Sequence, residues 1–230
     1  MRISEFKPVV EPDEKSVFVL IGDGRDDIKA FKGLVEKLTL AKELSCKVRL
    51  LVATRSYPRN NDLRTLSEWK GNSVFRAINV LASEKYRLKK FLVFYDLEHF
   101  SSLDKISKEL ENSGCKVTDI KKLGNYAYQI SCKFAGKDVV IFFSILGKEG
   151  ENDYKCLEDN MLDLPRVVDY LNLKMDKNSL TLQQIKRKLR KQGYEKLILQ
   201  SSAVDVKQAF KSLYIVLREI DKSFNEHRAP

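Results

Sequence analysis

The chain has 230 residues and a formal net charge of +10; 43% of the residues are hydrophobic and 32% are charged. This length fits one large domain or two small ones with a core that needs no disulfides, and the composition excludes intrinsic disorder. The positive charge favours polyanionic partners such as nucleic acid, although a merely solvated lysine-rich surface produces the same excess.

Membrane and secretory signals are absent from the sequence. No apolar run approaches the roughly 20 residues that span a bilayer, and the first 15 residues lack the apolar core of a signal peptide. The four cysteines form no CxxC pair, which is typical of reduced, structural thiols; they are Cys46, Cys115, Cys132 and Cys156. We therefore expect a cytoplasmic protein without a membrane partner.

The chain begins with a predicted N-terminal arm over residues 1–16, which contains Pro8 and Pro12. The arm either lies along the body or pairs at a sheet edge. An apolar run at 17–21 then predicts a buried strand.

A glycine-rich turn, Gly22–Asp27, follows this strand and leads into helical spacing from about Asp26 to Glu43. Its three aspartates would repel a phosphate unless a cation came too, so the turn predicts either a metal site or a set of helix caps. Residues 46–53 predict a second strand. The order strand, helix, strand implies a parallel, right-handed crossover.

The connection over 54–72 is long and polar, which is uncommon inside a compact domain. Arg55 and Arg59 interleave with Tyr57 and Trp69, an arrangement suited to stacking on unpaired bases and contacting phosphates. The alternative is that Trp69 simply fixes the connection to the core.

A helix is predicted from Ser73 to about residue 85, and the apolar run 91–95 predicts a third strand. This strand ends at Asp96 and Glu98. Alternate side chains of an extended segment project to the same side, so the two carboxylates are expected to point together and share one cation.

The remaining chain predicts a helix closing at Gly114, three further strands and then helices only. The predicted strands are 115–120, 126–134 and 139–146, the last two forming a hairpin around Ala135–Lys137. The predicted helical segments are 157–164, 165–173, 181–192 and one long helix over about 203–224.

Acidic residues collect where the first and third strands end. Asp23 follows strand 17–21, and Asp96 and Glu98 follow strand 91–95. Ligands of open parallel sheets bind outside the carboxyl ends of the strands, so these carboxylates meet in one crevice if the two strands are neighbours. Hard oxygen ligands of this kind suit Mg²⁺ or Mn²⁺.

Three motifs in this order, IGDGRDD, FYDLEHF and CLEDNML, resemble the Toprim domain of primases, topoisomerases and overcoming-lysogenization-defect nucleases. The similarity is greatest to small Toprim-like proteins of archaea and bacteria. It covers residues 17–163 and implies a Rossmann-like α/β fold with a mainly parallel Toprim-type sheet and flanking helices. Residues 164–230 would then be a C-terminal helical extension packed on that domain.

The resemblance also implies roles for the acidic residues. Asp23 falls on the family's acid/base and metal-binding position, Asp96 and Glu98 on its paired acidic motif, and Glu158 on its later glutamate, a supporting carboxylate. In the family the first position is glutamate and the second residue of the pair is aspartate. One shorter and one longer side chain either compensate within one site or mark a site that has lost catalysis.

The function implied is divalent-metal-dependent, nuclease-like phosphoryl transfer on nucleic acid phosphodiesters. The alternatives are a non-catalytic nucleic-acid- or partner-binding module with the same fold, and a small-nucleotide site at Gly22–Arg25. Glu158 and its neighbour Asp159 are also explained as residues that decorate a helix start. Candidate contacts to nucleic acid are Arg25, Arg55, Arg59, Lys186, Arg187 and Arg190. For Arg25 a pair with Asp96, and for the helix with Lys186 a solvated face, are the other interpretations.

Overall fold

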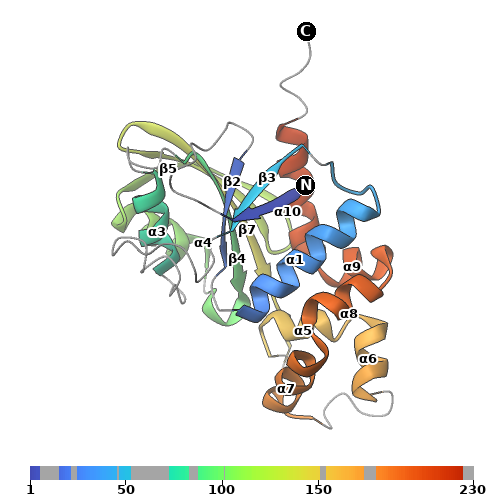
Figure 1. The fold of residues 1–230 in the computed structure, drawn as a ribbon. Helices are drawn as coiled ribbons and strands as arrows, with labels where there is room; N and C mark the ends of the chain where they lie inside the picture. Colours follow the sequence, from blue (N-terminus) through green and yellow to red (C-terminus); the bar gives the residue numbers. More distant parts are fainter. Residues whose placement is uncertain are drawn as a thin grey trace.

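The protein, seen here in a computed structural model, is described over residues 1–5, 16–21, 25–45, 47–52, 73–82, 88–100, 102–150, 154–173 and 180–224. These residues form a Rossmann-like α/β fold, with a seven-stranded, mostly parallel sheet between two layers of helices (Figure 1). The expected α/β class is therefore confirmed. The expectations that concern Asp23, Arg55, Arg59, Trp69 and Cys46 fall outside the described ranges.

Five strands of the sheet run parallel, and an antiparallel hairpin extends it at one side. In spatial order the strands are β1 (Arg2–Glu5), β3 (Arg49–Val52), β2 (Ser16–Ile21), β4 (Lys90–Asp96), β7 (Lys137–Leu146), β6 (Ala127–Phe134) and β5 (Cys115–Gly124). The predicted parallel crossover from β2 to β3 is confirmed. Of the two placements expected for the N-terminal arm, Arg2–Glu5 takes the sheet edge, beside β3.

The first and third predicted strands are direct neighbours. β2 pairs with β4 in parallel, with Ile21 opposite Phe94, so their carboxyl ends lie side by side. Both strands are continuous apolar runs because both sheet faces are covered. In β2, for example, Val17 and Val19 belong to the core on one face, whereas Phe18 and Leu20 belong to the core on the other.

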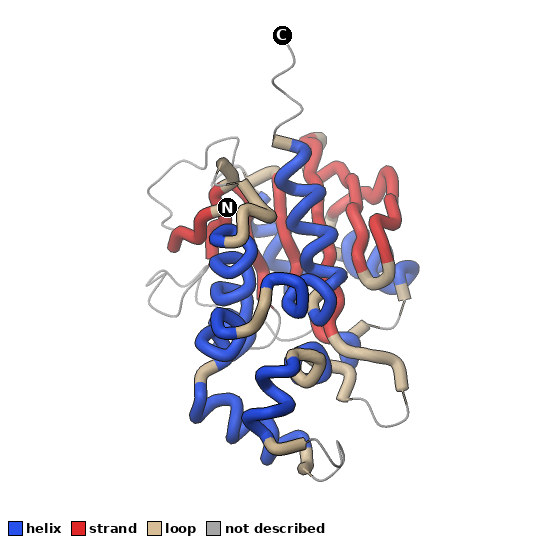
Figure 2. The backbone as a smooth tube through the Cα atoms, turned by 90° about the vertical axis from the view of Figure 1, so that its right-hand side faces the viewer, coloured by secondary structure: helices blue, strands red, loops and turns tan. Residues whose placement is uncertain are grey.

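The helices α3 (Ser73–Ala82) and α4 (Leu103–Asn112) cover one face of the sheet. Ser102 caps α4, its hydroxyl accepting a hydrogen bond from the backbone N–H of Lys105 at 3.2 Å. The opposite face is covered by α1 (Arg25–Leu40) and by the C-terminal helices. Figure 2 looks onto this second face, where the helix that leads to the C-terminus lies along the strands.

The C-terminal region is helical, as predicted. Its helices are α5 (Leu157–Met161), α6 (Pro165–Leu171), α7 (Leu182–Gln192), α8 (Tyr194–Gln200), α9 (Ala203–Ala209) and α10 (Lys211–Ser223). They share one hydrophobic core with α1 and the sheet, since buried side chains of both regions belong to a single cluster. The lower part of Figure 1 shows α5, α6 and α7 beyond the end of the sheet where α1 begins.

The prediction of a single long helix over 203–224 is wrong. Phe210, with φ −114° and ψ 43°, separates α9 from α10. The apolar spacing continues through this break because Val206, Phe210 and Leu213 are all buried in the same core, so periodicity alone does not reveal it. None of the helices in the described ranges combines the length and the apolar character that crossing a bilayer requires.

Candidate functional site

The carboxyl ends of β2 and β4 define the position of the candidate site. Asp96 is the last residue of β4 and is 9% exposed. Its Oδ1 accepts a hydrogen bond from the backbone N–H of Leu157 at 3.1 Å. This contact ties the end of a central strand to the first turn of α5, where Glu158 lies.

The prediction that the chain stays extended after β4 is wrong. Leu97–His99 form a 3₁₀ turn, so Asp96 and Glu98 do not lie on the same side of a strand. Leu97 turns into the core, and the Tyr95 hydroxyl donates a hydrogen bond to the carbonyl of His99 at 3.2 Å. Glu98 is 44% exposed, and its Oε1 lies 3.3 Å from Nε2 of His99.

Glu158 is buried, at 3% exposure, and is held by several donors. The hydroxyl of the buried Tyr194 donates to its Oε1 at 2.7 Å, and the thiol of Cys156 donates to its Oε2 at 3.0 Å. Nζ of Lys186 lies 3.6 Å from Oε2. A buried carboxylate is stable only when it has hydrogen-bond or ionic partners of this kind. Glu158 therefore does more than decorate a helix start.

Burial and the charge of Glu158 keep the Tyr194 hydroxyl and the Cys156 thiol protonated. Burial raises the pKa of the Tyr194 hydroxyl and of the Cys156 thiol, and the nearby charge of Glu158 raises both further. Both groups therefore keep their protons and donate to the carboxylate.

Lys186 is half-buried beside Glu158. Partial burial works against its charge, but attraction by Glu158 and by Asp96 and Glu98 outweighs the burial and raises the pKa of the ammonium. Glu158 lies at ion-pair distance from this cation, with Nζ of Lys186 3.6 Å from Oε2.

The two residues after Glu158 build the frame of the site. Asp159 caps α5, its carboxylate accepting hydrogen bonds from the backbone N–H of Tyr154 at 2.9 Å and of Cys156 at 3.3 Å. Asn160 accepts from the backbone N–H of Gly147 at 2.8 Å and donates to the carbonyl of Ala209 at 2.7 Å. Asn160 therefore links the end of β7 to the end of α9.

We expect Asn160→Ala to lower the free energy of unfolding by about 2–4 kcal/mol, because the buried N–H of Gly147 and the buried carbonyl of Ala209 would lose their hydrogen-bond partner. Urea denaturation measures this change. Asn112→Ala, at an exposed position at the end of α4, serves as the control and should change stability by no more than about 0.5 kcal/mol. Equal losses in the two variants would contradict the linking role of Asn160.

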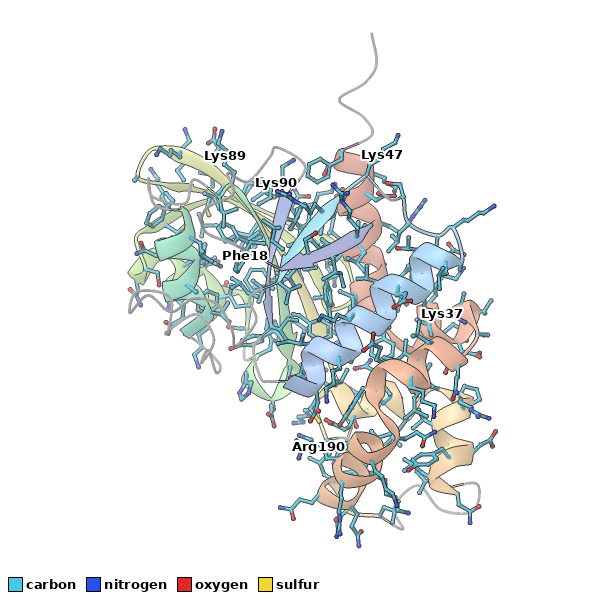
Figure 3. All side chains as sticks on the ribbon, viewed as in Figure 1. Phe18, Lys37, Lys47, Lys89, Lys90 and Arg190 are labelled. Carbon is cyan, nitrogen blue, oxygen red and sulfur yellow. The ribbon has the colours of Figure 1, made fainter. Side chains whose placement is uncertain are left out.

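Two basic side chains of helix α7 form ion pairs with acidic residues of other helices. Lys186 faces Glu158, and one turn later Nε of Arg190 lies 2.5 Å from Oδ2 of Asp26, in the first turn of α1. Figure 3 labels Arg190 near the start of α1. Arg187 is exposed. Of the predicted basic contacts, Lys186 and Arg190 thus pair with carboxylates, and the Arg25 side chain lies outside the described part of the chain.

Tyr194 and the helix that carries it, α8, are not among the elements predicted from the sequence. The signal was present, since Tyr194, Leu197 and Ile198 have the spacing of one helical face, and all three are buried in α8. Cys156 was expected to be a structural thiol, and its contact with Glu158 was not foreseen. Nothing in the local sequence indicates these contacts, because Tyr194 lies 36 residues after Glu158.

The acidic residues at the end of β4 supply some, but not all, of the ligands that a divalent ion needs. Carboxylate oxygens are the ligands that Mg²⁺ and Mn²⁺ prefer, and Asp96, Glu98 and Glu158 all carry them. Within the described ranges, however, no three His, Cys, Asp or Glu side chains lie close enough together to hold a metal. A metal site here therefore requires a further ligand, and Asp23 follows the strand next to β4.

Comparison with known proteins gives no match: no family model, curated protein or solved structure is significantly similar to this chain.

Proposed function

We propose that the protein is a Toprim-like, divalent-metal-dependent enzyme that acts on the phosphodiester bonds of nucleic acid. The observation that carries this proposal is the position of Asp96 at the carboxyl end of a central parallel strand, where its Oδ1 accepts the backbone N–H of Leu157, next to the buried Glu158. Ligands of open α/β sheets bind at this end, where the connections diverge. The motif order found in the sequence and the net charge of +10 support the same function.

The proposed roles follow from the contacts of each residue. Asp23, Asp96 and Glu98 would hold Mg²⁺ or Mn²⁺. Glu158, whose two oxygens already accept hydrogen bonds from Tyr194 and Cys156, supports the ion through its charge. A bound metal would supply a positive centre that stabilises charge on a phosphoryl group. Asp23 would exchange the proton of the attacking group.

The positive surface beside the site suits a polyanionic substrate. Arg187 is exposed on α7, and Arg190 is 62% exposed beside its partner Asp26. Exposed ion pairs of this kind contribute little to stability, so Arg190 remains available to a phosphate. Arg25, Arg55 and Arg59 stay candidates for the same surface.

A second candidate function is a non-catalytic module that binds nucleic acid or a partner. One observation favours it: the ammonium of Lys186 already balances the buried Glu158, with Nζ 3.6 Å from Oε2. A site that is neutralised by its own lysine needs no metal for stability. The two functions differ in whether a divalent ion binds.

Thermal unfolding with and without Mg²⁺ or Mn²⁺ tests the proposal, combined with cleavage assays on single-stranded and duplex DNA and RNA. A ligand bound by the folded state alone raises Tm, by an amount that corresponds to about 2.7 kcal/mol at 100 times its Kd. We expect this rise in the native protein and its loss in Asp23→Asn. A native protein without any rise and without cleavage would leave the binding module as the function.

A further inference from the structure

Two cysteines that the candidate site does not use lie against each other in the sheet. Sγ of Cys115 and Sγ of Cys132 are 2.7 Å apart, and each residue is 2% exposed. Both sulfurs are free thiols in this structure. Their separation is only a little longer than the roughly 2.05 Å of a disulfide bond. Little movement therefore separates this pair from a covalent link.

The strand register brings the two side chains to one face of the sheet. Cys132 of β6 lies opposite Val117 of β5, and Cys115 of β5 lies opposite Phe134 of β6. Side chains two residues apart in a strand share a face, so the two cysteines are diagonal neighbours on the face that α3 and α4 cover. A bond between their sulfurs would need no change of register.

The edge of the sheet gives a small reagent a route to this pair. Among the described strands β5 is the last in the sheet order, and Cys115 is its first residue. The ladder between β5 and β6 is interrupted directly after Val117, where the register shifts at Thr118. Edge segments beside such an interruption open at a lower free energy than central strands. Brief opening at this end of β5 exposes the two thiols while the core stays folded.

The two thiols are not equivalent. The hydrogen bond between the sulfurs lowers the pKa of the Cys115 thiol, against the effect of burial. The same contact raises the pKa of Cys132, which burial raises further. Cys115 therefore loses its proton first, with the S–H of Cys132 as donor. Because the thiolate is the nucleophile, Cys115 is the sulfur that reacts with an oxidant, and Cys132 stands beside it to attack the product.

We propose that Cys115 and Cys132 are a peroxide-sensitive redox pair, which forms a reversible disulfide between β5 and β6. This inference is independent of the proposed metal-dependent function, because neither sulfur touches the acidic site. The disulfide would fasten the edge strand of the sheet to its neighbour.

The reaction with hydrogen peroxide has two steps. The Cys115 thiolate attacks one oxygen and the O–O bond breaks; the released hydroxide takes up the proton that Cys115 lost, and Cys115 becomes a sulfenic acid. The sulfur of Cys132 then attacks that of Cys115, the S–O bond breaks, and the hydroxyl leaves as water with the proton of Cys132. Two thiols and one peroxide thus give one disulfide and two waters, and the two electrons that the sulfurs lose reduce the peroxide.

Peptide mapping without reduction, after treatment of the full chain with hydrogen peroxide, tests this inference. We expect peptides joined through Cys115 and Cys132, and their separation by dithiothreitol. The linked protein should melt about 6–12 °C above the reduced one, as a disulfide between residues 17 positions apart predicts. A native chain in which both sulfurs stay reduced, or are oxidised without being linked, would overturn the inference.

Two single variants separate the roles of the thiols. In Cys132→Ser we expect Cys115 to stop at the sulfenic acid, which dimedone traps as a covalent adduct. In Cys115→Ser we expect Cys132 to remain unmodified at the same peroxide concentration. Equal modification of the remaining sulfur in both variants would overturn the assignment of Cys115 as the nucleophile. Unfolding curves confirm that each variant is folded.

Cys156→Ser is the matched control. Cys156 is also a buried thiol, but its sulfur contacts Glu158 and not a second sulfur. We expect the disulfide between Cys115 and Cys132 to form in this variant to the same extent as in the native chain. Its loss in Cys156→Ser would contradict a pair that acts by itself.

Discussion

Replacing Gly147 by alanine is expected to lower the free energy of unfolding by about 3 kcal/mol or more, since a strained backbone and a displaced segment add their costs. Gly147 has φ +102°, and a Cβ there would lie 2.4 Å from the carbonyl carbon of Lys155 and 2.6 Å from the backbone nitrogen of Cys156. Both atoms belong to the backbone and cannot rotate away. Urea denaturation measures the loss.

The same substitution should also disturb the acidic site. The segment that must move, Lys155 and Cys156, leads directly into α5, and the backbone N–H of Gly147 donates to Asn160. Displacement of this segment shifts Glu158 relative to Asp96. We therefore expect Gly147→Ala to weaken any metal-induced rise in Tm as well as lowering Tm itself.

Gly136→Ala provides the matched control. Gly136 also has a positive φ, +79°, but a Cβ at this position meets nothing within 4 Å. It lies in the two-residue turn between β6 and β7, where Ala135 also has positive φ. The cost should be that of a left-handed residue alone, about 1–2 kcal/mol. Similar losses at the two glycines would show that the contact with Lys155 and Cys156 is unimportant.

Asp96→Asn is expected to abolish the stabilisation by divalent metal, about 2.7 kcal/mol at 100 times Kd, and to abolish cleavage. Asparagine has the same shape and keeps an oxygen that accepts the backbone N–H of Leu157, the 3.1 Å contact of Asp96. The fold should therefore survive while the charge is lost. The measurement is Tm with and without Mg²⁺ or Mn²⁺, together with the cleavage assay.

Asp104→Asn is the control for this loss of charge. Asp104 lies in the first turn of α4 and is exposed, so the variant changes the net charge by the same amount away from β4. Its response to metal should equal that of the native protein. A metal-induced rise in Tm that persists in Asp96→Asn would show that Asp96 is not a ligand, whatever the control does.

Most of the regular structure could be predicted because its signals are local. The apolar runs of β2, β4 and β7 reflect burial on both faces of the sheet, and the two residues between β6 and β7 have the positive φ values of a hairpin turn. Helix α7 was predicted from Ile185 and Leu189, which are both buried. The break at Phe210 and the 3₁₀ turn after Asp96 escaped prediction, since tertiary packing sets both.

The candidate site was predicted in part. The sequence by itself determined that Asp96 follows a buried strand, and it left open whether this strand neighbours the first, which the structure shows. Tertiary structure decided that Glu158 is buried against Tyr194 and Cys156 and that Lys186 lies beside it. It also decided that the chain after Asp96 forms a 3₁₀ turn, which separates Asp96 from Glu98. Strand and helix signals are local in the chain. The partners of a buried charge come from distant segments, and only the packed core brings those segments together.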